Sequence, residues 1–180
     1  SIGKYEERKN HRMLVEIVEE LSAVSNIHLT IAGERTTSAH QAYYDRLAAY
    51  IADHGLQDKV TLLVNLNRQQ VAEQYRKADL FVIPSTREPA SISQLEAMAF
   101  SLPVVCGDKN GTACYVENGV NGWQFRDNQK ASLKEVLDKM VGSPEQLQKM
   151  GQESYRLIQE KYQIENYLEG IETLLAKLGE

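Results

Sequence analysis

Short apolar runs alternate along the chain with longer stretches in which apolar residues recur at helical spacing. The short runs predict strands at Ile27–Ala32, Val60–Val64, Leu80–Ile83, Pro103–Cys106 and Gly122–Phe125. The longer stretches predict helices at His11–Val24, Ala39–His54, Gln69–Lys77, Ser91–Phe100, Lys130–Val141, Pro144–Lys161 and Ile164–Leu178. Strands that alternate with helices indicate βαβ units, so we expect an α/β fold with a Rossmann-like, doubly wound parallel sheet flanked by helices. The first four runs are rich in Val, Ile and Leu, as strands buried on both faces are.

The two ends of the chain add to this prediction. The opening residues Ser1–Gly3 look like the tail of a strand that is already under way. At the other end, Ser143 and Pro144 suit the cap and the first position of a helix. The charged helices of residues 144–180 follow the last strand, and we expect them to pack on the flank of the domain or on a part that this chain lacks.

Composition narrows the class of protein. The 180 residues suit one domain, and 42% hydrophobic with 25% charged residues is ordinary for a soluble protein. The net charge of −5 disfavours a nucleic-acid partner, because such proteins carry a basic excess. The chain has no apolar run of about 18 residues and no apolar segment at its start. Cys106 and Cys114 stand apart from other metal-ligand residues, so we expect reduced thiols of a cytoplasmic protein rather than zinc ligands or a disulfide.

Residues 84–96 (PSTREPASISQLE) form the candidate functional segment. The segment follows an apolar strand and leads into a helix, and ligands of open α/β sheets bind beyond the carboxyl ends of strands. Free N–H groups at a helix start favour an anion such as a diphosphate. Glu96, within the helix, can accept hydrogen bonds from a ribose diol, and Glu88, in the loop, can bind the hydroxyls of a sugar. The small residues that leave the backbone accessible are Ala90, Ser91 and Ser93. The segment therefore favours a nucleotide diphosphate sugar.

Simpler interpretations of the same residues stay open. Glu88 and Glu96 can be solvated surface charges, and Ser91 and Ser93 can merely cap the helix. The apolar run Ala97–Phe100 directly after Glu96 indicates that the helix is buried along one side, which favours a site.

The stretch from Ala78 to Val105 (ADLFVIPSTREPASISQLEAMAFSLPVV) resembles the signature of the retaining glycosyltransferases of family four. In that signature a Glu, seven residues and a second Glu precede Ala-Met-Ala and a Pro-Val-Val strand, and the two glutamates here are Glu88 and Glu96. Three more segments resemble the same family in order along the chain: Gly3–Asn10 (GKYEERKN), His28–Glu34 (HLTIAGE) and Asn118–Trp123 (NGVNGW). The resemblance covers nearly the whole chain and implies one half of a GT-B fold, in which two Rossmann-like domains face a cleft.

The resemblance also implies roles for individual residues. Lys9, with Lys4 in the place of the usual arginine, would pair with the donor diphosphate. Glu88 would contact the donor sugar, so that Glu88 and Lys9 are the candidate catalytic residues, and Glu96 would hold the ribose hydroxyls. Arg8 is expected to be a solvated basic residue. The expected substrate-binding set is Lys4, Lys9, Glu88, Ala90, Ser91, Ile92, Ser93 and Glu96.

Two departures from the family pattern affect these roles. The first Glu is usually followed by Gly-Phe-Gly, whereas Pro89–Ser91 follow it here. Because proline lacks an N–H and fixes φ, we expect different donor contacts from this loop. The strand Val60–Val64 is usually followed by Gly, and here by Asn65, which tolerates the left-handed region, so we expect the turn to survive. The base would lie near residues 65–67 or near the loop after Gly33.

The resemblance further implies that residues 1–180 form the nucleotide-sugar-binding C-terminal domain of a two-domain enzyme. The acceptor-binding N-terminal domain would then be absent, and with it the acceptor site, any membrane contact and the histidine that this domain often supplies. We expect the isolated chain to be inactive alone and cytoplasmic, with membrane association only through that domain. The four histidines match no catalytic position of the family, and we expect surface positions for His11, His28, His40 and His54.

The function that the resemblance implies is transfer of a sugar from a nucleoside diphosphate sugar to a glycan or lipid-linked saccharide, as in polysaccharide biosynthesis. Transfer would retain the anomeric configuration and need no metal or other cofactor. Three alternatives stay open: another enzyme of this fold, such as a sugar epimerase or a glycogen phosphorylase relative; a nucleotide-sugar-binding module without catalysis; and a Rossmann-like domain with neither role. The sequence has no Gly-x-Gly-x-x-Gly and no Walker loop, which disfavours dinucleotide oxidoreductases and nucleoside triphosphatases.

Overall fold

The computed structural model describes residues 1–178 and contains each of the predicted strands and helices. The strands are β1 (Leu29–Gly33), β2 (Val60–Val64), β3 (Phe81–Ile83), β4 (Val104–Gly107) and β5 (Gly122–Phe125). The helices are α1 (His11–Leu21), α2 (Ser38–Asp53), α3 (Arg68–Lys77), α4 (Ile92–Ala99), α5 (Lys130–Val141), α6 (Pro144–Lys161) and α7 (Ile164–Leu178). Two short 3₁₀ turns, η1 (Glu7–Lys9) and η2 (Ala113–Tyr115), precede α1 and β5. The largest error in the predicted ends is at α1, which stops at Leu21 rather than Val24.

All strand pairs are parallel, as predicted. β1 pairs with β2, and β3, β4 and β5 pair in that order, so the strands form two hydrogen-bonded parts rather than one continuous ladder. Ile2 forms an isolated parallel bridge with Ala32, which places the opening residues beside β1. Parallel pairing brings the carboxyl ends of the strands to one edge of the sheet, where loops can build a site.

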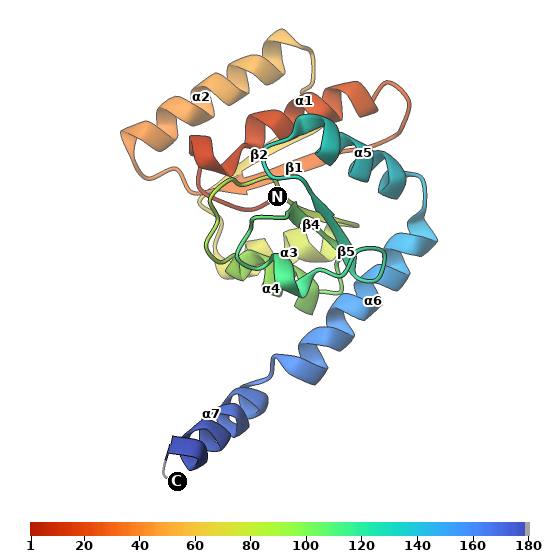
Figure 1. Cartoon of the computed structure of the whole chain (residues 1–180). Coiled ribbons are helices and arrows are strands. Elements are labelled where there is room, and N and C mark those ends of the chain that lie inside the picture. The colour runs from red at the N-terminus through yellow and green to blue at the C-terminus, as the bar shows by residue number, and fades with distance from the viewer. Residues whose placement is uncertain (179–180) are drawn as a thin grey trace.

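Side chains of the central strands alternate between the two faces of the sheet, and this divides the core in two. Val82 and Val105 pack with residues of α1, α2 and α5. Phe81, Ile83 and Val104 pack with residues of α4 and α6. Figure 1 shows the same layers, with α1, α2 and α5 over one face and α3 and α4 over the other. The doubly wound α/β fold is therefore confirmed.

The strand β2 is less buried than predicted. Val60 is buried, whereas the four residues after it are only partly buried. The reason is position, because β2 pairs with β1 alone among the described residues and so leaves one side open. The strands β3 and β4 are buried throughout, as predicted.

Tyr5 holds the ends of β1 and β2 together from inside the core. Its hydroxyl lies 3.0 Å from the Ile31 carbonyl oxygen and 2.9 Å from that of Leu63, so it donates to one carbonyl of each strand. Burial raises the pKa of Tyr5, which keeps the hydroxyl protonated. Gly33 permits this crossing, since a Cβ there would lie 2.5 Å from the Tyr5 ring.

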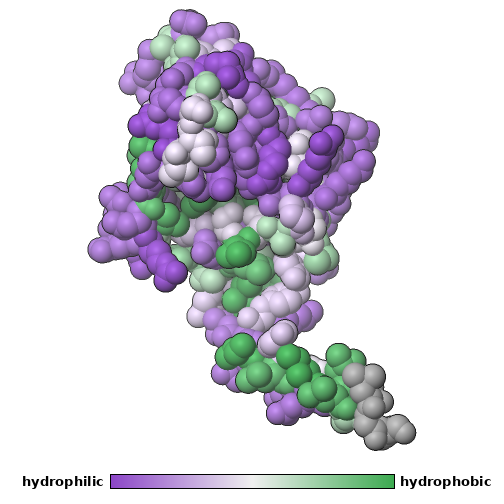
Figure 2. Space-filling model, turned by 90° about the vertical axis from the view of Figure 1, so that its left-hand side faces the viewer, coloured by the Kyte–Doolittle hydropathy of each residue, from purple (hydrophilic) through white to green (hydrophobic). Residues whose placement is uncertain are grey.

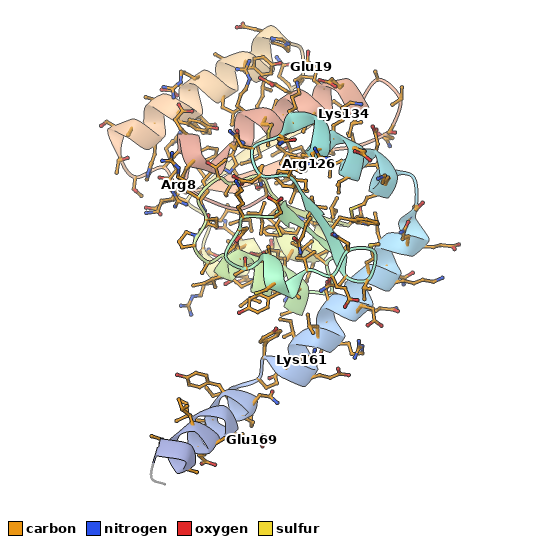
Figure 3. The ribbon with its side chains drawn as sticks, viewed as in Figure 1. Arg8, Glu19, Arg126, Lys134, Lys161 and Glu169 are labelled. Atoms are coloured by element: carbon orange, nitrogen blue, oxygen red, sulfur yellow. The ribbon has the colours of Figure 1, made fainter. Side chains whose placement is uncertain are left out.

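The last two helices differ in how they pack. α6 buries Met150, Gly151, Ser154 and Ile158 against the domain. α7 extends away from the rest of the molecule, and Glu169 lies on this extension (Figures 1 and 3). Figure 2 shows an apolar stripe along it. The exposed large apolar residues of this helix are Ile164, Tyr167, Leu168, Ile171, Leu174 and Leu175. None of the helices among residues 1–178 is long and apolar enough to cross a bilayer.

The two cysteines are both free, as predicted, and differ in exposure. Cys106 is buried on β4, whereas Cys114 is exposed on η2. Burial raises the pKa of the Cys106 thiol to about 12. This thiol therefore stays protonated and behaves as a small apolar core residue.

The expectation that all four histidines lie at the surface is wrong for two of them. His28 and His54 are exposed, but His11 and His40 have exposed fractions of 1% and 8%. His11 begins α1 with its ring turned inward, edge-on to Tyr5 at a centroid distance of 5.7 Å. Its Nδ1 has no hydrogen-bond partner among the described residues. The sequence pattern missed this because an aromatic imidazole packs like the tyrosines around it.

The buried His11 should make stability depend on pH. Burial, reinforced by nearby positive charge that includes Lys9, lowers the pKa of His11 to about 3, against about 6.5 in an unfolded chain. The unfolded state therefore binds the proton first, so the contribution of His11 to stability is complete above pH 6.5 and falls as the pH drops toward 3. From pH 8 to pH 5 this contribution to the free energy of unfolding should fall by about 2 kcal/mol.

Urea unfolding of the wild type and of His11→Phe at several pH values checks this expectation. The phenylalanine keeps an aromatic ring in the same place and cannot be protonated. Between pH 8 and pH 5 its unfolding free energy should fall by about 2 kcal/mol less than that of the wild type. An equal fall in both proteins would assign the pH dependence to other groups.

Candidate functional site

One open cavity lies at the carboxyl ends of β1, β2 and β3. Its volume of about 510 Å³ is within the usual range for small-molecule sites. The start of the chain, the loops after β1 and β2, α3, and the loop between β3 and α4 all contribute to it. The lining residues are Ile2, Gly3, Lys4, Arg8, Lys9, Ala32, Gly33, Glu34, Asn65, Leu66, Val71, Glu88, Ala90, Ser91, Ile92 and Ser93. The sheet topology thus gathers segments that are far apart in the sequence.

Glu88 is a buried carboxylate at this cavity, with only 7% of its side chain exposed. Its Oε2 accepts hydrogen bonds from Lys9 Nζ and, at 3.2 Å, from Arg8 Nη1. Lys9 is also largely buried, at 13% exposed, whereas Arg8 is more open, at 41%. A buried charge is tolerated when it is paired in this way, and removing one partner is costly.

Backbone contacts fix the basic residues beside the Glu88 loop. The Thr86 N–H donates to the Arg8 carbonyl at 2.8 Å, which joins the loop after β3 to the turn η1. Asn10, next to Lys9, has a φ of 55° and ends this turn before α1 begins. The turn therefore presents Arg8 and Lys9 to the cavity from a defined position.

The cavity is positive in charge. Lys4, Arg8 and Lys9 oppose two carboxylates, Glu34 and Glu88. Lys4 is half exposed and lies 3.8 Å from Glu34, a distance that is loose enough for a ligand to compete with Glu34 for the ammonium group. The cavity is therefore suited to an anion of more than one charge.

The first turn of α4 faces the same cavity without a side-chain cap. Ser91 occupies the cap position but makes no capping hydrogen bond. Its hydroxyl instead lies 3.0 Å from that of Ser93, so the capping interpretation of these two serines is wrong. The backbone N–H groups of Ile92 and Ser93 have no partner within residues 1–178. They form, with the helix dipole, an anion-binding position.

A neighbouring loop supports the residues around Glu88. The Gly111 N–H donates to the Glu88 carbonyl at 2.8 Å. A Cβ on Gly111 would lie 1.7 Å from the Pro89 carbonyl oxygen, so only glycine permits this approach. Behind it, the buried amide of Gln94 exchanges hydrogen bonds with Thr112 at 2.8 and 2.7 Å. These contacts fix α4 and its preceding loop as one unit.

Asn65 forms the turn after β2 in place of the usual glycine, as predicted. Its φ is 51°, in the left-handed region. The Asn65 N–H donates to the Gly33 carbonyl at 3.0 Å, and its side-chain oxygen accepts from the Arg35 N–H at 2.8 Å. The asparagine therefore links the loops after β1 and β2 on the cavity wall.

Glu96 lies outside the lining of the cavity. It is exposed on α4, one turn beyond Ser93, and its Oε2 accepts a hydrogen bond of 2.9 Å from the Tyr75 hydroxyl. The structure thus brings seven of the expected substrate-binding residues to one cavity and places the eighth, Glu96, outside its lining. The seven are Lys4, Lys9, Glu88, Ala90, Ser91, Ile92 and Ser93.

Sequence reasoning missed the contacts of two residues. Arg8 is exposed, as expected for a solvated residue, but it also pairs with Glu6 at 2.8 Å and with Glu88. Its place directly before Lys9 was the available signal. Tyr75 was not singled out, because nothing in the sequence shows that a tyrosine at the end of one helix reaches a carboxylate on the next.

The fold and the cavity define a class of protein: an α/β domain whose sheet edge holds a basic cleft at a helix start. Residues 1–157 match the family of glycosyl transferases group 1, so the chain belongs to that family. The chain has the same fold as the C-terminal domain of a group 1 glycosyl transferase, LpcC from Francisella tularensis, on which it superposes with a TM-score of 0.81 and 20% identity. That match covers 91% of this chain and 85% of the other.

Curated relatives are longer than this chain. D-inositol 3-phosphate glycosyltransferase of Nocardia farcinica is 30% identical over 107 residues, which are 59% of this chain and 24% of the relative. The lipopolysaccharide core biosynthesis mannosyltransferase LpcC of Rhizobium leguminosarum is 24% identical over 91% of this chain and 46% of its own length. The chain therefore spans less than half of the relatives that it matches.

Longer solved chains contain the same fold. Sucrose-phosphate synthase from Thermosynechococcus elongatus superposes with a TM-score of 0.84 and 20% identity, covering 98% of this chain and 44% of the other. HepE from Anabaena, solved in complex with UDP, superposes with a TM-score of 0.82 and 18% identity, covering 98% of this chain and 48% of its own. The fold of this chain is thus one half of the GT-B fold.

Proposed function

We propose that this chain is the donor-binding half of a glycosyltransferase and that its cavity binds a nucleoside diphosphate sugar. The observation that supports this most is the convergence of Lys4, Arg8 and Lys9 on the uncapped start of α4. A diphosphate needs both point charges and N–H donors, and the cavity offers both. The complex of HepE with UDP, which has the same fold, agrees with this ligand class.

In this proposal the reaction retains the configuration of the anomeric carbon and uses no metal. The basic side chains and the start of α4 stabilise the negative charge that grows on the departing diphosphate. Glu88, held by Lys9 and Arg8 at the cavity wall, contacts the donor sugar and stabilises positive charge on its ring. Lys9 and Glu88 are the proposed catalytic residues, and Glu96 holds the ribose.

The acceptor half is proposed to be an N-terminal domain that faces this cavity. Relatives are more than twice as long as the matching part of this chain, which leaves room for such a domain in the whole protein. We propose a glycan or lipid-linked saccharide as acceptor and a cytoplasmic location, with any membrane contact made by that domain. The chain alone matches less than half of these relatives. A nucleotide-sugar-binding module without catalysis is therefore the second candidate function of the isolated chain.

Calorimetric titration with UDP, GDP and ADP, and with uridine, guanosine and adenosine, tests the proposal. Saturable binding of one diphosphate, much stronger than that of its nucleoside, is the expected result, and the preferred base would then be known. If none of the three diphosphates binds up to millimolar concentration, the proposed donor site is wrong. Transfer that appears only when the chain is joined to an acceptor-binding domain would favour the enzyme over the binding module.

Replacing Glu96 by alanine should weaken nucleotide binding about 10- to 150-fold, because hydrogen bonds to a charged group contribute about 1.5–3 kcal/mol. The loss should be similar for the diphosphate and for its nucleoside, since both contain the ribose. Titration of the two ligands against the variant measures it. Glu145→Ala, at an exposed position of α6, is the matched control. Unchanged affinity in Glu96→Ala would contradict the proposed contact between Glu96 and the ribose.

A further inference from the structure

Tyr75 joins the core to Glu96, which lies one turn of α4 beyond the cavity-lining Ser93. Its side chain is buried, stacked on Phe100 at a centroid distance of 5.3 Å and packed edge-on to Phe81 at 5.7 Å. Only its hydroxyl reaches outward, from the last turns of α3 to α4. There it lies 2.9 Å from Glu96 Oε2 and 3.2 Å from the Ser93 carbonyl oxygen. A rigid ring thus places one donor beside two acceptors of α4.

The direction of the hydrogen bond is fixed by charge. Burial, and then the negative charge of Glu96, raise the pKa of Tyr75, so its hydroxyl stays protonated and donates. Glu96 is exposed, and an exposed glutamate otherwise samples many rotamers. The bond occupies Oε2 alone, and Oε1 has no partner among residues 1–178. Tyr75 therefore orders a carboxylate that still has free acceptor sites.

We propose that Tyr75 is a positioning residue that orients Glu96 for the ribose of a bound nucleotide. This inference rests on the proposed function and extends it by a residue that does not touch the ligand. A vicinal diol needs a carboxylate in one orientation, and fixing that orientation before binding lowers the entropy lost on binding. The second acceptor, the Ser93 carbonyl, fixes the first turn of α4 relative to the same ring.

The variant Tyr75→Phe tests the role, because it removes one oxygen and keeps the packed ring. The probes are UDP, GDP and ADP and their 2′-deoxy forms, titrated calorimetrically. For the diphosphate that binds, Tyr75→Phe should weaken the ribose form about 3- to 10-fold, the effect of losing one hydrogen bond. The deoxy form should lose much less, so the preference for ribose should fall.

A double-variant cycle separates positioning from packing. In a Glu96→Ala background, Tyr75→Phe should have no further effect on affinity, since the group that it orients is gone. Tyr115→Phe removes a hydroxyl that makes no hydrogen bond to Glu96 and is the matched control. Thermal unfolding of every variant shows whether α4 stays in place.

Each remaining outcome overturns a specific statement. If the wild type prefers ribose and Tyr75→Phe keeps both its affinity and that preference, the positioning role is wrong and the proposed function stands. If Tyr75→Phe weakens ribose and deoxy forms equally, Tyr75 acts through the fold of α4 and not through Glu96. If the wild type binds none of the diphosphates, the proposed function and this inference fall together.

Discussion

Replacing Gly151 by alanine should lower the free energy of unfolding by about 3 kcal/mol, the upper range for overpacking a well-packed core. A Cβ at Gly151 would lie 2.0 Å from the Ser101 carbonyl oxygen and 3.4 Å from Pro103 Cδ. The first of these atoms belongs to the backbone of the turn between α4 and β4, which cannot rotate away. The helix α6 would have to move off the sheet and break the 3.1 Å hydrogen bond from Ser154 to the Asn121 carbonyl.

The matched control is Gly170→Ala, for which the expected change in the free energy of unfolding has the opposite sign. Gly170 is also inside a helix, α7, but no atom lies within 4 Å of the Cβ that alanine would add there. Alanine is favoured over glycine in a helix by about 1 kcal/mol, so Gly170→Ala should leave stability unchanged or raise it slightly. Urea unfolding of both variants measures the contrast. Stabilisation by Gly151→Ala would mean that α6 does not approach the turn as closely as the structure shows.

The contrast between these two glycines shows what a sequence pattern leaves out. Both positions fit the period of an amphipathic helix, and the pattern predicted α6 and α7 correctly. Whether a helix packs depends on a surface elsewhere in the chain. α6 is held by the turn after α4 and by the residue before β5, whereas α7 extends away with Leu168 and Leu175 exposed. The spacing of apolar residues shows which side of a helix is apolar, but it does not show which surface that side packs against.

The same distinction explains the candidate site. The position of residues 88–93 at the sheet edge could be predicted because strand, loop and helix start are local features, whereas Glu96 lies outside the cavity lining. Asn65 could also be predicted in its left-handed turn, since that depends on the residue itself. The contacts of Arg8 and Tyr75 could not be predicted, because they join segments 80 and 21 residues apart. The surface position expected for His11 was wrong for a related reason, because its burial depends on tyrosines from other parts of the chain.

Replacing Lys9 by alanine should weaken binding of the nucleoside diphosphate about 100-fold and leave binding of the nucleoside nearly unchanged. Two effects combine. The ligand loses one hydrogen-bonding cation, a contribution of about 1.5–3 kcal/mol. Glu88 also loses its more buried partner and keeps only Arg8 at 3.2 Å, so an under-compensated carboxylate faces the phosphates. Calorimetric titration of both ligands measures the difference.

The double variant Lys9→Ala/Glu88→Gln separates the two effects. Removing the carboxylate charge removes the repulsion and the uncompensated buried charge, so part of the lost affinity should return and the fold should recover stability. Lys134→Ala is the matched control, because Lys134 pairs with Asp138 on α5 and lies well away from Arg8 (Figure 3). Its charge is screened over that distance at physiological salt.

The cycle of Lys9 and Glu88 also tests what kind of pair they form. If Glu88 only neutralises Lys9, then Glu88→Gln alone should bind the diphosphate as tightly as the wild type or more tightly, because the lysine no longer has a competing partner. If Glu88 contacts the sugar, the same variant should bind the diphosphate normally but bind the complete nucleotide sugar less tightly. If Lys9→Ala weakens the binding of diphosphate and nucleoside equally, the defect lies in the fold of the cavity. That result would contradict the roles proposed for Lys9 and Glu88.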